Sequence, residues 1–157
     1  MKNSRFTIKL DGAGLKEIED VTTRLVVESS LGLPSMFHII LAAQEKPQYV
    51  FNFIDSKPIK VGQRIEVLAS ADDKNPLKSL IEGTVTSIEP DFRGDGSVQL
   101  HVRGYDDSVR LTKGKKTRSF KEATPSNIIS KIAQENGLTA QVDNFGKTLM
   151  HLFQFNQ

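Results

Sequence analysis

The chain has 157 residues, of which 38% are hydrophobic and 25% charged, enough for one soluble domain with a substantial core. It has no cysteine, which excludes disulfides, thiolate catalysis and cysteine zinc sites. The net charge is only +2, but six of the 21 lysines and arginines lie between Arg110 and Lys121, without an acidic residue among them. The other 15 face 19 acidic residues, so a basic segment interrupts a mildly acidic chain.

The first segment, FTIKL, is predicted to be a strand, because Phe6, Ile8 and Leu10 alternate with polar residues. Asp11 and the glycines that follow it indicate a turn. No apolar run approaches the roughly 20 residues of a membrane span. The N-terminus also lacks the apolar stretch of a signal peptide, so we expect neither feature.

Short strands separated by turns are predicted through the middle of the chain. Within them, Gly62 and Gly83 interrupt the alternation and indicate bulges or a close backbone approach. The sequence Gly94-Asp95-Gly96 favours a hairpin. The segment 35–42 is apolar enough to be covered on both faces. The predicted strands cover residues 23–29, 35–42, 49–54, 59–70, 80–90, 98–106 and 149–155.

One helix is predicted, with Thr124 as N-cap and Pro125 at its first position. Gly137 fits the left-handed residue after the helix, with Leu138 closing a hydrophobic contact. The apolar stripe of this helix consists of Ile128, Ile129, Ile132 and Ala133. Many short strands and one helix indicate a mainly β fold, a small barrel or sandwich with a helical appendage.

No pattern in the sequence indicates catalysis, a metal or a cofactor. The three histidines, His38, His101 and His151, lie far apart and are interpreted as strand surface positions. The adjacent acids Asp72-Asp73 and Asp106-Asp107 would point apart in an extended segment, so they are interpreted as turn or solvent residues. We therefore expect no enzyme activity.

The basic segment is the main functional candidate, and three interpretations of it remain open. Clustered Lys113, Lys115, Lys116 and Arg118 with nearby aromatic rings are typical of nucleic-acid binding. A protein-facing or solvated loop is favoured by the interspersed apolar residues and by the modest net charge. An anionic small ligand is the third possibility.

Four motifs in the second half of the sequence support a family resemblance. They are LIEGTVTSIEPDF, VRGYDDSVRL, the run TKGKKTRSF, and the helix TPSNIISKIAQENGL. In this order and spacing they resemble the VgrG and phage late-control protein D family, the tail hub and spike proteins of contractile injection systems. The family often has Arg-Ser-His where this chain has Asp107-Ser108-Val109.

The resemblance implies a tube-like β-barrel of the phage-hub type with a helical appendage. The chain would then be a single N-terminal hub domain, 1–157, of a longer spike protein. Its barrel would span about 1–106, its connector and helix about 107–138, and its closing strand about 148–156.

The resemblance further implies a structural baseplate protein, without cofactor or small-molecule substrate, that joins the inner tube to the trimeric spike. The resemblance implies that it would belong to a type VI secretion system, a phage tail or a phage-tail-like particle. Its partners would be other copies of itself, the inner tube protein and baseplate proteins, in a particle assembled in the cytoplasm and delivered outside the cell. The rival hypothesis is a nucleic-acid-binding barrel of OB type.

Under the structural hypothesis, the stretch 103–121 presents cations and packing anchors to other protein surfaces. Leu111 is a further packing anchor beside this set. The predicted interface residues are Arg103, Tyr105, Asp106, Arg110, Lys113, Lys116, Arg118 and Phe120.

Overall fold

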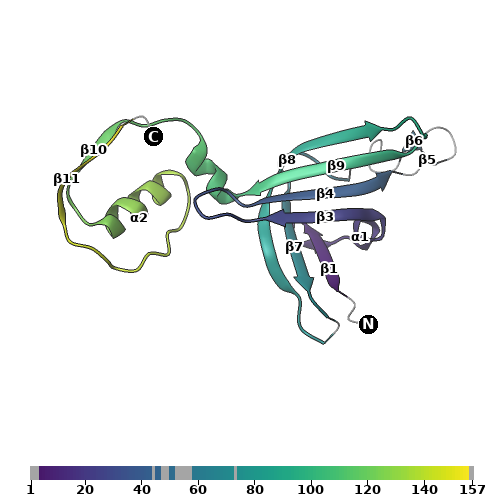
Figure 1. The fold of residues 1–157 in the computed structure, drawn as a ribbon, viewed down its shortest axis with the longest axis horizontal. Helices are drawn as coiled ribbons and strands as arrows, with labels where there is room; N and C mark the ends of the chain where they lie inside the picture. The colour runs from purple at the N-terminus through teal and green to yellow at the C-terminus, as the bar shows by residue number, and fades with distance from the viewer. Residues whose placement is uncertain (1–3, 44, 47–49, 52–57, 73, 156–157) are drawn as a thin grey trace. The chain divides into compact units, whose positions relative to one another are not determined.

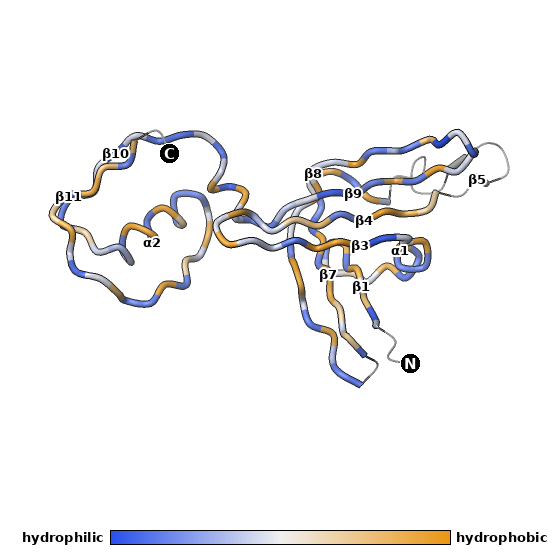
Figure 2. The backbone as a smooth tube through the Cα atoms, in the orientation of Figure 1, coloured by the Kyte–Doolittle hydropathy of each residue, from blue (hydrophilic) through white to orange (hydrophobic). Residues whose placement is uncertain are grey.

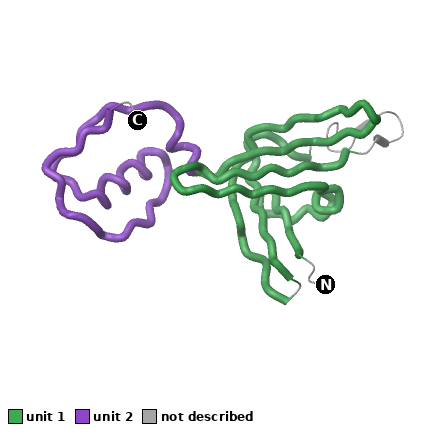
Figure 3. Tube along the Cα trace, in the orientation of Figure 1, with its two compact units in different colours: residues 1–107 green, residues 108–157 purple. Residues whose placement is uncertain are grey.

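The protein is described here from a computed structural model that covers residues 4–43, 45–46, 50–51, 58–72 and 74–155. It divides into two compact units, residues 1–107 and 108–157 (Figure 3). None of the helices in these described ranges is long and apolar enough to cross a membrane.

Unit 1 is built on one antiparallel sheet of seven strands, which curls into a half-barrel (Figure 1). The strand order is β2-β1-β7-β8-β9-β4-β3, and β5 and β6 form a separate pair. The mainly β prediction is confirmed. The elements are β1 (Arg5–Leu10), β2 (Ala13–Gly14), α1 (Lys16–Val21), β3 (Thr22–Glu28), β4 (Met36–Ala43), β5 (Glu45–Lys46), β6 (Val50–Phe51), β7 (Arg64–Ser70), β8 (Lys78–Phe92) and β9 (Val98–Asp106).

The core of unit 1 lies on the concave face of this sheet, where alternate residues of each strand point inward. Phe37, Ile39 and Leu41 of β4 are almost fully buried there, beside Leu100 and Val102 of β9. In β4 the residue between Ile39 and Leu41, Ile40, is buried too, as expected for a strand covered on both faces. Figure 2 colours the chain by hydropathy, and the second half of β4 is coloured hydrophobic there.

A short helix that the sequence did not predict, α1, covers the end of the sheet beside β1. Its Ile18 is buried in the core, and the Glu19 Oε1 atom accepts a hydrogen bond of 3.1 Å from the backbone N–H of Ile8. That N–H lies beyond the short β2 strand, which pairs only with Lys9 and Leu10. α1 therefore satisfies a strand edge that β2 is too short to reach.

The bulge predicted near Gly83 lies elsewhere in β8, whereas at Gly62 the structure has the second predicted alternative, a close backbone approach. In its pairing with β9, β8 shifts register between Val85 and Ser87, which returns Ile88 to the core side. In its pairing with β7, the register shifts between Val67 and Leu68, opposite Ile81 and Ser79, so neither shift lies at Gly83 itself. Gly62 belongs to a turn with φ of 94°, and its N–H donates to the carbonyl of Val85 at 2.9 Å, which is a close approach without a bulge.

Gly83 and Gly104 lie in the paired strands β8 and β9, at positions where neighbouring atoms leave no space for a side chain. A Cβ at Gly104 would lie 2.2 Å from the Thr84 carbonyl oxygen and 2.3 Å from Cζ of Phe37. A Cβ at Gly83 would lie 2.4 Å from the Tyr105 carbonyl oxygen. Both positions therefore need glycine for space rather than for backbone conformation.

The strand predicted over 59–70 begins only at Arg64, because the chain turns at Gly62. The strands predicted over 23–29, 35–42, 80–90, 98–106 and 149–155 agree with the structure to within two residues at each end, and so does the hairpin at Gly94-Asp95-Gly96. Arg93 and Ser97 close this loop through a hydrogen bond of 2.9 Å between the Arg93 N–H and the Ser97 carbonyl. The strand predicted over 49–54 lies mostly outside the described residues, and only Val50–Phe51 of it is described, as β6.

Unit 2 consists of one helix and a two-stranded antiparallel ribbon. The helix ends as predicted: the Thr124 hydroxyl accepts from the Asn127 N–H at 3.2 Å, and Gly137 adopts φ of 68°. Leu138 donates to the Ala133 carbonyl at 2.9 Å, the bond of a Schellman end. The elements are the 3-10 turn η1 (Asp107–Thr112), which begins at the last residue of unit 1, and then β10 (Arg118–Ala123), α2 (Pro125–Glu135) and β11 (Leu149–Gln154).

The core of unit 2 is small. Only three hydrophobic side chains among its described residues are buried: Phe120, Ile128 and Ala133. Ile129 was predicted in the apolar stripe of the helix, but its side chain is 42% exposed. The stripe is therefore narrower than predicted, since only part of the helix faces the ribbon.

Candidate protein-interaction site

The predicted interface residues fall into two groups. Arg103, Tyr105 and Asp106 end β9 in unit 1, whereas the other five lie in unit 2. Each group is described within its own unit.

At the end of β9, two of the three predicted residues are engaged within unit 1. Arg103 Nη1 donates to Glu89 Oε2 at 2.5 Å, and this hydrogen bond lowers the pKa of Glu89. Asp106 accepts from the Ser35 N–H at 3.1 Å through its carboxylate and donates its own N–H to the Ser35 carbonyl at 2.9 Å. The Tyr105 side chain is partly exposed.

The interpretation of Asp106-Asp107 as turn or solvent residues is corrected by these contacts. Asp107 Oδ1 accepts from Arg64 Nη1 at 2.8 Å, and Asp106 holds the turn before β4 through Ser35. The two carboxylates thus fix the C-terminal end of β9 to β7 and to the β3–β4 hairpin.

In unit 2, Arg118 is the centre of a local cluster. Its guanidinium pairs with the Glu135 carboxylate, donates from Nε to Gln154 Oε1 at 2.8 Å, and lies 5.1 Å from the Phe120 ring centroid. Lys116 Nζ reaches the same Glu135 carboxylate at 3.4 Å. The hydrogen bond from Arg118 lowers the pKa of Glu135. These cations therefore join β10 to the end of α2.

Arg110 also has an internal role, because its Nη1 lies 3.4 Å from the carbonyl oxygen of Gly137, just after α2. A cation near the C-terminal end of a helix is favourable for the helix dipole. By contrast, Lys113, Lys115 and Lys121 are exposed, and within the described part of the chain they form no ion pair. The outward charge of the basic segment rests on these three lysines.

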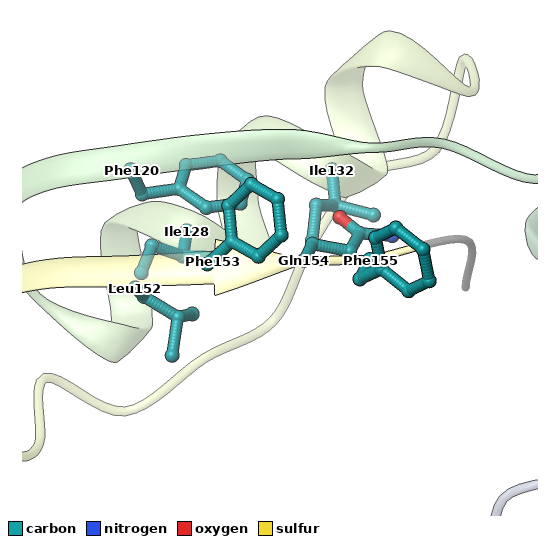
Figure 4. A pocket seen from close by; sticks show the side chains of 7 residues that line it. All are labelled: Phe120, Ile128, Ile132, Leu152, Phe153, Gln154 and Phe155. Carbon is teal, nitrogen blue, oxygen red and sulfur yellow. The ribbon is translucent and has the colours of Figure 1, made fainter.

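An apolar groove lies beside the cluster, between the ribbon and α2 (Figure 4). It has a volume of about 540 Å³, and its walls include exposed rings, with Phe153 58% and Phe155 67% exposed. Among its residues, only Phe120 was predicted to lie in an interface, while Ile128 and Ile132 were predicted in the apolar stripe of the helix. The sequence contains one sign of this groove: in the last strand, apolar residues occupy both sets of alternating positions. The lining residues are Phe120, Ile128, Ile132, Leu152, Phe153, Gln154 and Phe155.

Two histidines that the sequence suggested were unrelated lie side by side on the convex face of the sheet. His38 Nε2 and His101 Nδ1 are 3.0 Å apart, and only one of these atoms can carry the shared hydrogen. His101 Nε2 is buried without a hydrogen-bond partner, 3.8 Å from Asp91 Oδ2. Burial and the nearby Arg103 lower the pKa of His38. The sequence did not predict this contact, because it depends on the pairing of β4 with β9.

No group of three histidine, aspartate or glutamate side chains in the described ranges is arranged to hold a metal ion. The arrangement offers charged and apolar surfaces for another macromolecule.

The whole chain, residues 1–157, matches the model of the family described as the Alg8 N-terminal domain. No curated protein sequence matches it. Among solved structures, a tail protein of Neisseria meningitidis is similar over 85% of this chain, with a TM-score of 0.58 and 16% identity. An E. coli component of the type VI secretion system, described as similar to the T4 bacteriophage tail proteins gp27 and gp5, is similar over 96%, with a TM-score of 0.56 and 14% identity. The chain spans 34% and 39% of the lengths of these two proteins.

Proposed function

The chain belongs to the family of Alg8 N-terminal domains, and we propose that it is a structural hub component of a contractile injection system. In this role it joins the inner tube to the trimeric spike at the baseplate. The observation that carries the proposal is the fold, which is similar over 85% and 96% of the chain to a Neisseria tail protein and to a type VI secretion component.

The proposed partners are other copies of the longer protein, which together form the trimer, and the inner tube and baseplate proteins. The particle would assemble in the cytoplasm and act outside the cell. The protein would turn over no substrate. This proposal is supported by the type of surface described above, since charged and apolar side chains are the usual components of protein interfaces.

Arg118 and Lys116 hold unit 2 together through Glu135, so they are unsuitable positions for testing contact with a partner. Reversing their charges would break the Glu135 cluster and disturb unit 2 itself. The exposed pair Lys113 and Lys115 can be changed to glutamate without losing a described ion pair. We expect this double variant in the full-length protein to reduce particle assembly by weakening attraction to acidic partner surfaces.

The experiment is complementation of a strain in which the gene has been deleted, with particles counted by electron microscopy after sedimentation. The wild-type gene should restore particles, and the Lys113→Glu, Lys115→Glu variant should restore fewer. The control variant, Lys60→Glu with Lys74→Glu, makes the same change of charge at exposed positions of unit 1. Normal particles in the deletion strain would refute the proposed function. Normal particles with the Lys113→Glu, Lys115→Glu variant would refute only the role of these two lysines in partner binding.

Binding of nucleic acid is the competing function, because residues 108–157 hold eight lysines and arginines against three acids. The internal use of Arg110, Lys116 and Arg118 reduces the charge available to a polyanion. Titration of labelled single-stranded DNA at several salt concentrations distinguishes the two functions. Affinity that falls steeply with salt would favour nucleic acid, whereas the hub proposal expects no saturable binding.

A further inference from the structure

The convex face of unit 1 holds a polar cluster that the proposed function does not use. It extends across the neighbouring strands β3, β4, β9 and β8 (Figure 1). At its centre, His38 Nε2 and His101 Nδ1 are 3.0 Å apart, whereas the two ring centroids are 5.1 Å apart. The centroids are thus 2.1 Å further apart than the nitrogens (5.1 minus 3.0), so the two nitrogens point toward one another. This is the geometry of an N–H···N hydrogen bond.

A hydrogen bond between two ring nitrogens needs one donor and one acceptor, so this gap holds a single hydrogen. The other nitrogen of His101 indicates which ring supplies it. His101 Nε2 is buried, has no hydrogen-bond partner in the described part of the chain, and lies 3.8 Å from Asp91 Oδ2. A hydrogen on Nε2 faces this carboxylate favourably, whereas a lone pair would face it unfavourably. In the neutral pair, His38 Nε2–H therefore donates to His101 Nδ1.

One added proton fits this arrangement without movement of the rings. His101 then carries hydrogens on both nitrogens, with Nδ1–H donating to His38 Nε2 and Nε2–H facing Asp91. A second added proton does not fit, because both facing nitrogens would then be donors and no acceptor would remain between them. Two cationic rings would also face one another at hydrogen-bond distance.

The charged groups on the surrounding strands also oppose the second proton. Burial lowers the pKa of His38, and so do Arg103 on β9, His101 and Arg24 on β3, whereas Glu89 on β8 raises it. Each nearby carboxylate already has an arginine partner. Glu89 binds Arg103 at 2.5 Å, and Asp91 binds Arg93 of the β8–β9 hairpin at 3.2 Å. With three positive and two negative groups around the neutral rings, the cluster has a net charge of +1. The charged residues of the cluster are Arg24, Glu89, Asp91, Arg93 and Arg103.

We propose that His38 and His101 form a pH-sensitive pair that closes the convex face of unit 1 across β4 and β9. The shared hydrogen holds the rings together while the pair carries no added proton or one. The second proton separates the rings and raises the charge of the cluster from +1, with neutral rings, to +3. Acidic surroundings would thereby make this face attract acidic surfaces and repel basic ones. This inference does not rest on the proposed function.

The test is an NMR titration of the histidine ring signals in the whole 157-residue chain, from about pH 8 to about pH 4. We expect the two rings to titrate in two steps, more than about one pH unit apart, because they accept one proton much more readily than two. The nuclear Overhauser contact between the rings should persist through the first step and disappear with the second.

Two variants assign the effect to the pair. In His101→Gln, the glutamine oxygen can still accept from His38 Nε2–H, but it takes up no proton in this pH range. His38 should then titrate in one step, at least about half a pH unit above its step in the wild type, a roughly threefold gain in proton affinity. His151→Gln is the matched control, since His151 lies in β11 of unit 2, opposite Lys121, and both steps should remain. Circular dichroism of each variant establishes that it is folded.

Three results would overturn the proposal: a single step shared by both rings of the wild type, a ring contact that persists after the second step, or an unchanged His38 step in His101→Gln. Equal shifts in His101→Gln and His151→Gln would overturn it too. Should His101→Gln fail to fold, the wild-type titration and the ring contact still decide the question. The particle-assembly experiment is independent of these measurements, so the two proposals can fail separately.

Discussion

Replacing Gly104 with alanine tests whether β9 needs glycine at this position for lack of space beside β8 and Phe37. The added methyl would lie 2.2 Å from the Thr84 carbonyl oxygen and 2.3 Å from Phe37 Cζ, whereas ordinary contacts begin near 3.4 Å. About 1 Å of space must therefore come from a ladder carbonyl and from a ring that is fully buried. Overpacking of this kind typically costs about 1–3 kcal/mol.

A weakened ladder hydrogen bond would add about 1 kcal/mol to that cost. The loss of chain entropy in the unfolded state offsets about 0.4–1 kcal/mol. We therefore expect Gly104→Ala to lower the free energy of unfolding of unit 1 by about 2 kcal/mol. Such a loss is a large part of the stability of a domain.

Urea unfolding followed by tyrosine fluorescence measures this quantity, because both tyrosines of the chain lie in residues 1–107. Gly14→Ala is the control, since a Cβ there meets no atom within 4 Å, and we expect a change within about 1 kcal/mol. Phe37→Leu should partly compensate Gly104→Ala, because leucine lacks Cζ. Equal effects of the two glycine substitutions would refute the reasoning.

Three further substitutions test other contacts. Thr124→Ala removes the N-cap of α2 and should cost unit 2 about 1 kcal/mol, measured from the helical circular dichroism signal during unfolding; an unchanged midpoint would contradict the capping role. His38 has a lowered folded pKa, so the unfolded state binds its proton more tightly, and stability should fall as the pH decreases from about 6.5 through the folded value. His38→Gln should flatten that part of the stability–pH curve, and a curve of unchanged slope would show that another group titrates. Glu135→Gln removes the carboxylate partner of Arg118 and Lys116, so unit 2 should be less stable at low salt and the difference should shrink at high salt.

Local signals predicted the ends of α2 well. Thr124, Pro125 and Gly137 each determine backbone geometry through their own chemistry, so they act without help from distant parts of the chain. The alternation of Val98, Leu100 and Val102 likewise predicted the buried face of β9, because a period of two has the same meaning in any sheet.

Features that depend on strand pairing could not be predicted in this way. The contact between His38 and His101 exists because β4 and β9 are neighbours, although 63 residues separate the two histidines. The groove of unit 2 depends on how β11 meets α2, and its apolar residues were interpreted only as a strand. Gly104 combines the two situations. It belongs to the VRGYD motif that the sequence shows, but the reason for a glycine there is the space taken by Phe37 and Thr84, which only the structure shows.

The position of β9 has a consequence for how unit 1 folds. β9 is the last strand of this unit to leave the ribosome, yet it lies between β8 and β4 in the sheet. The β3–β4 and β7–β8–β9 segments are local hairpins, whereas the β4–β9 pairing joins residues about sixty positions apart and forms late because of its loop-closure entropy. Until then, β4 leaves the backbone groups of one edge unpaired, in a strand whose Phe37, Ile39 and Leu41 side chains belong to the core of the folded unit. During synthesis, this apolar strand is where a nascent chain would first pair with a neighbour and aggregate.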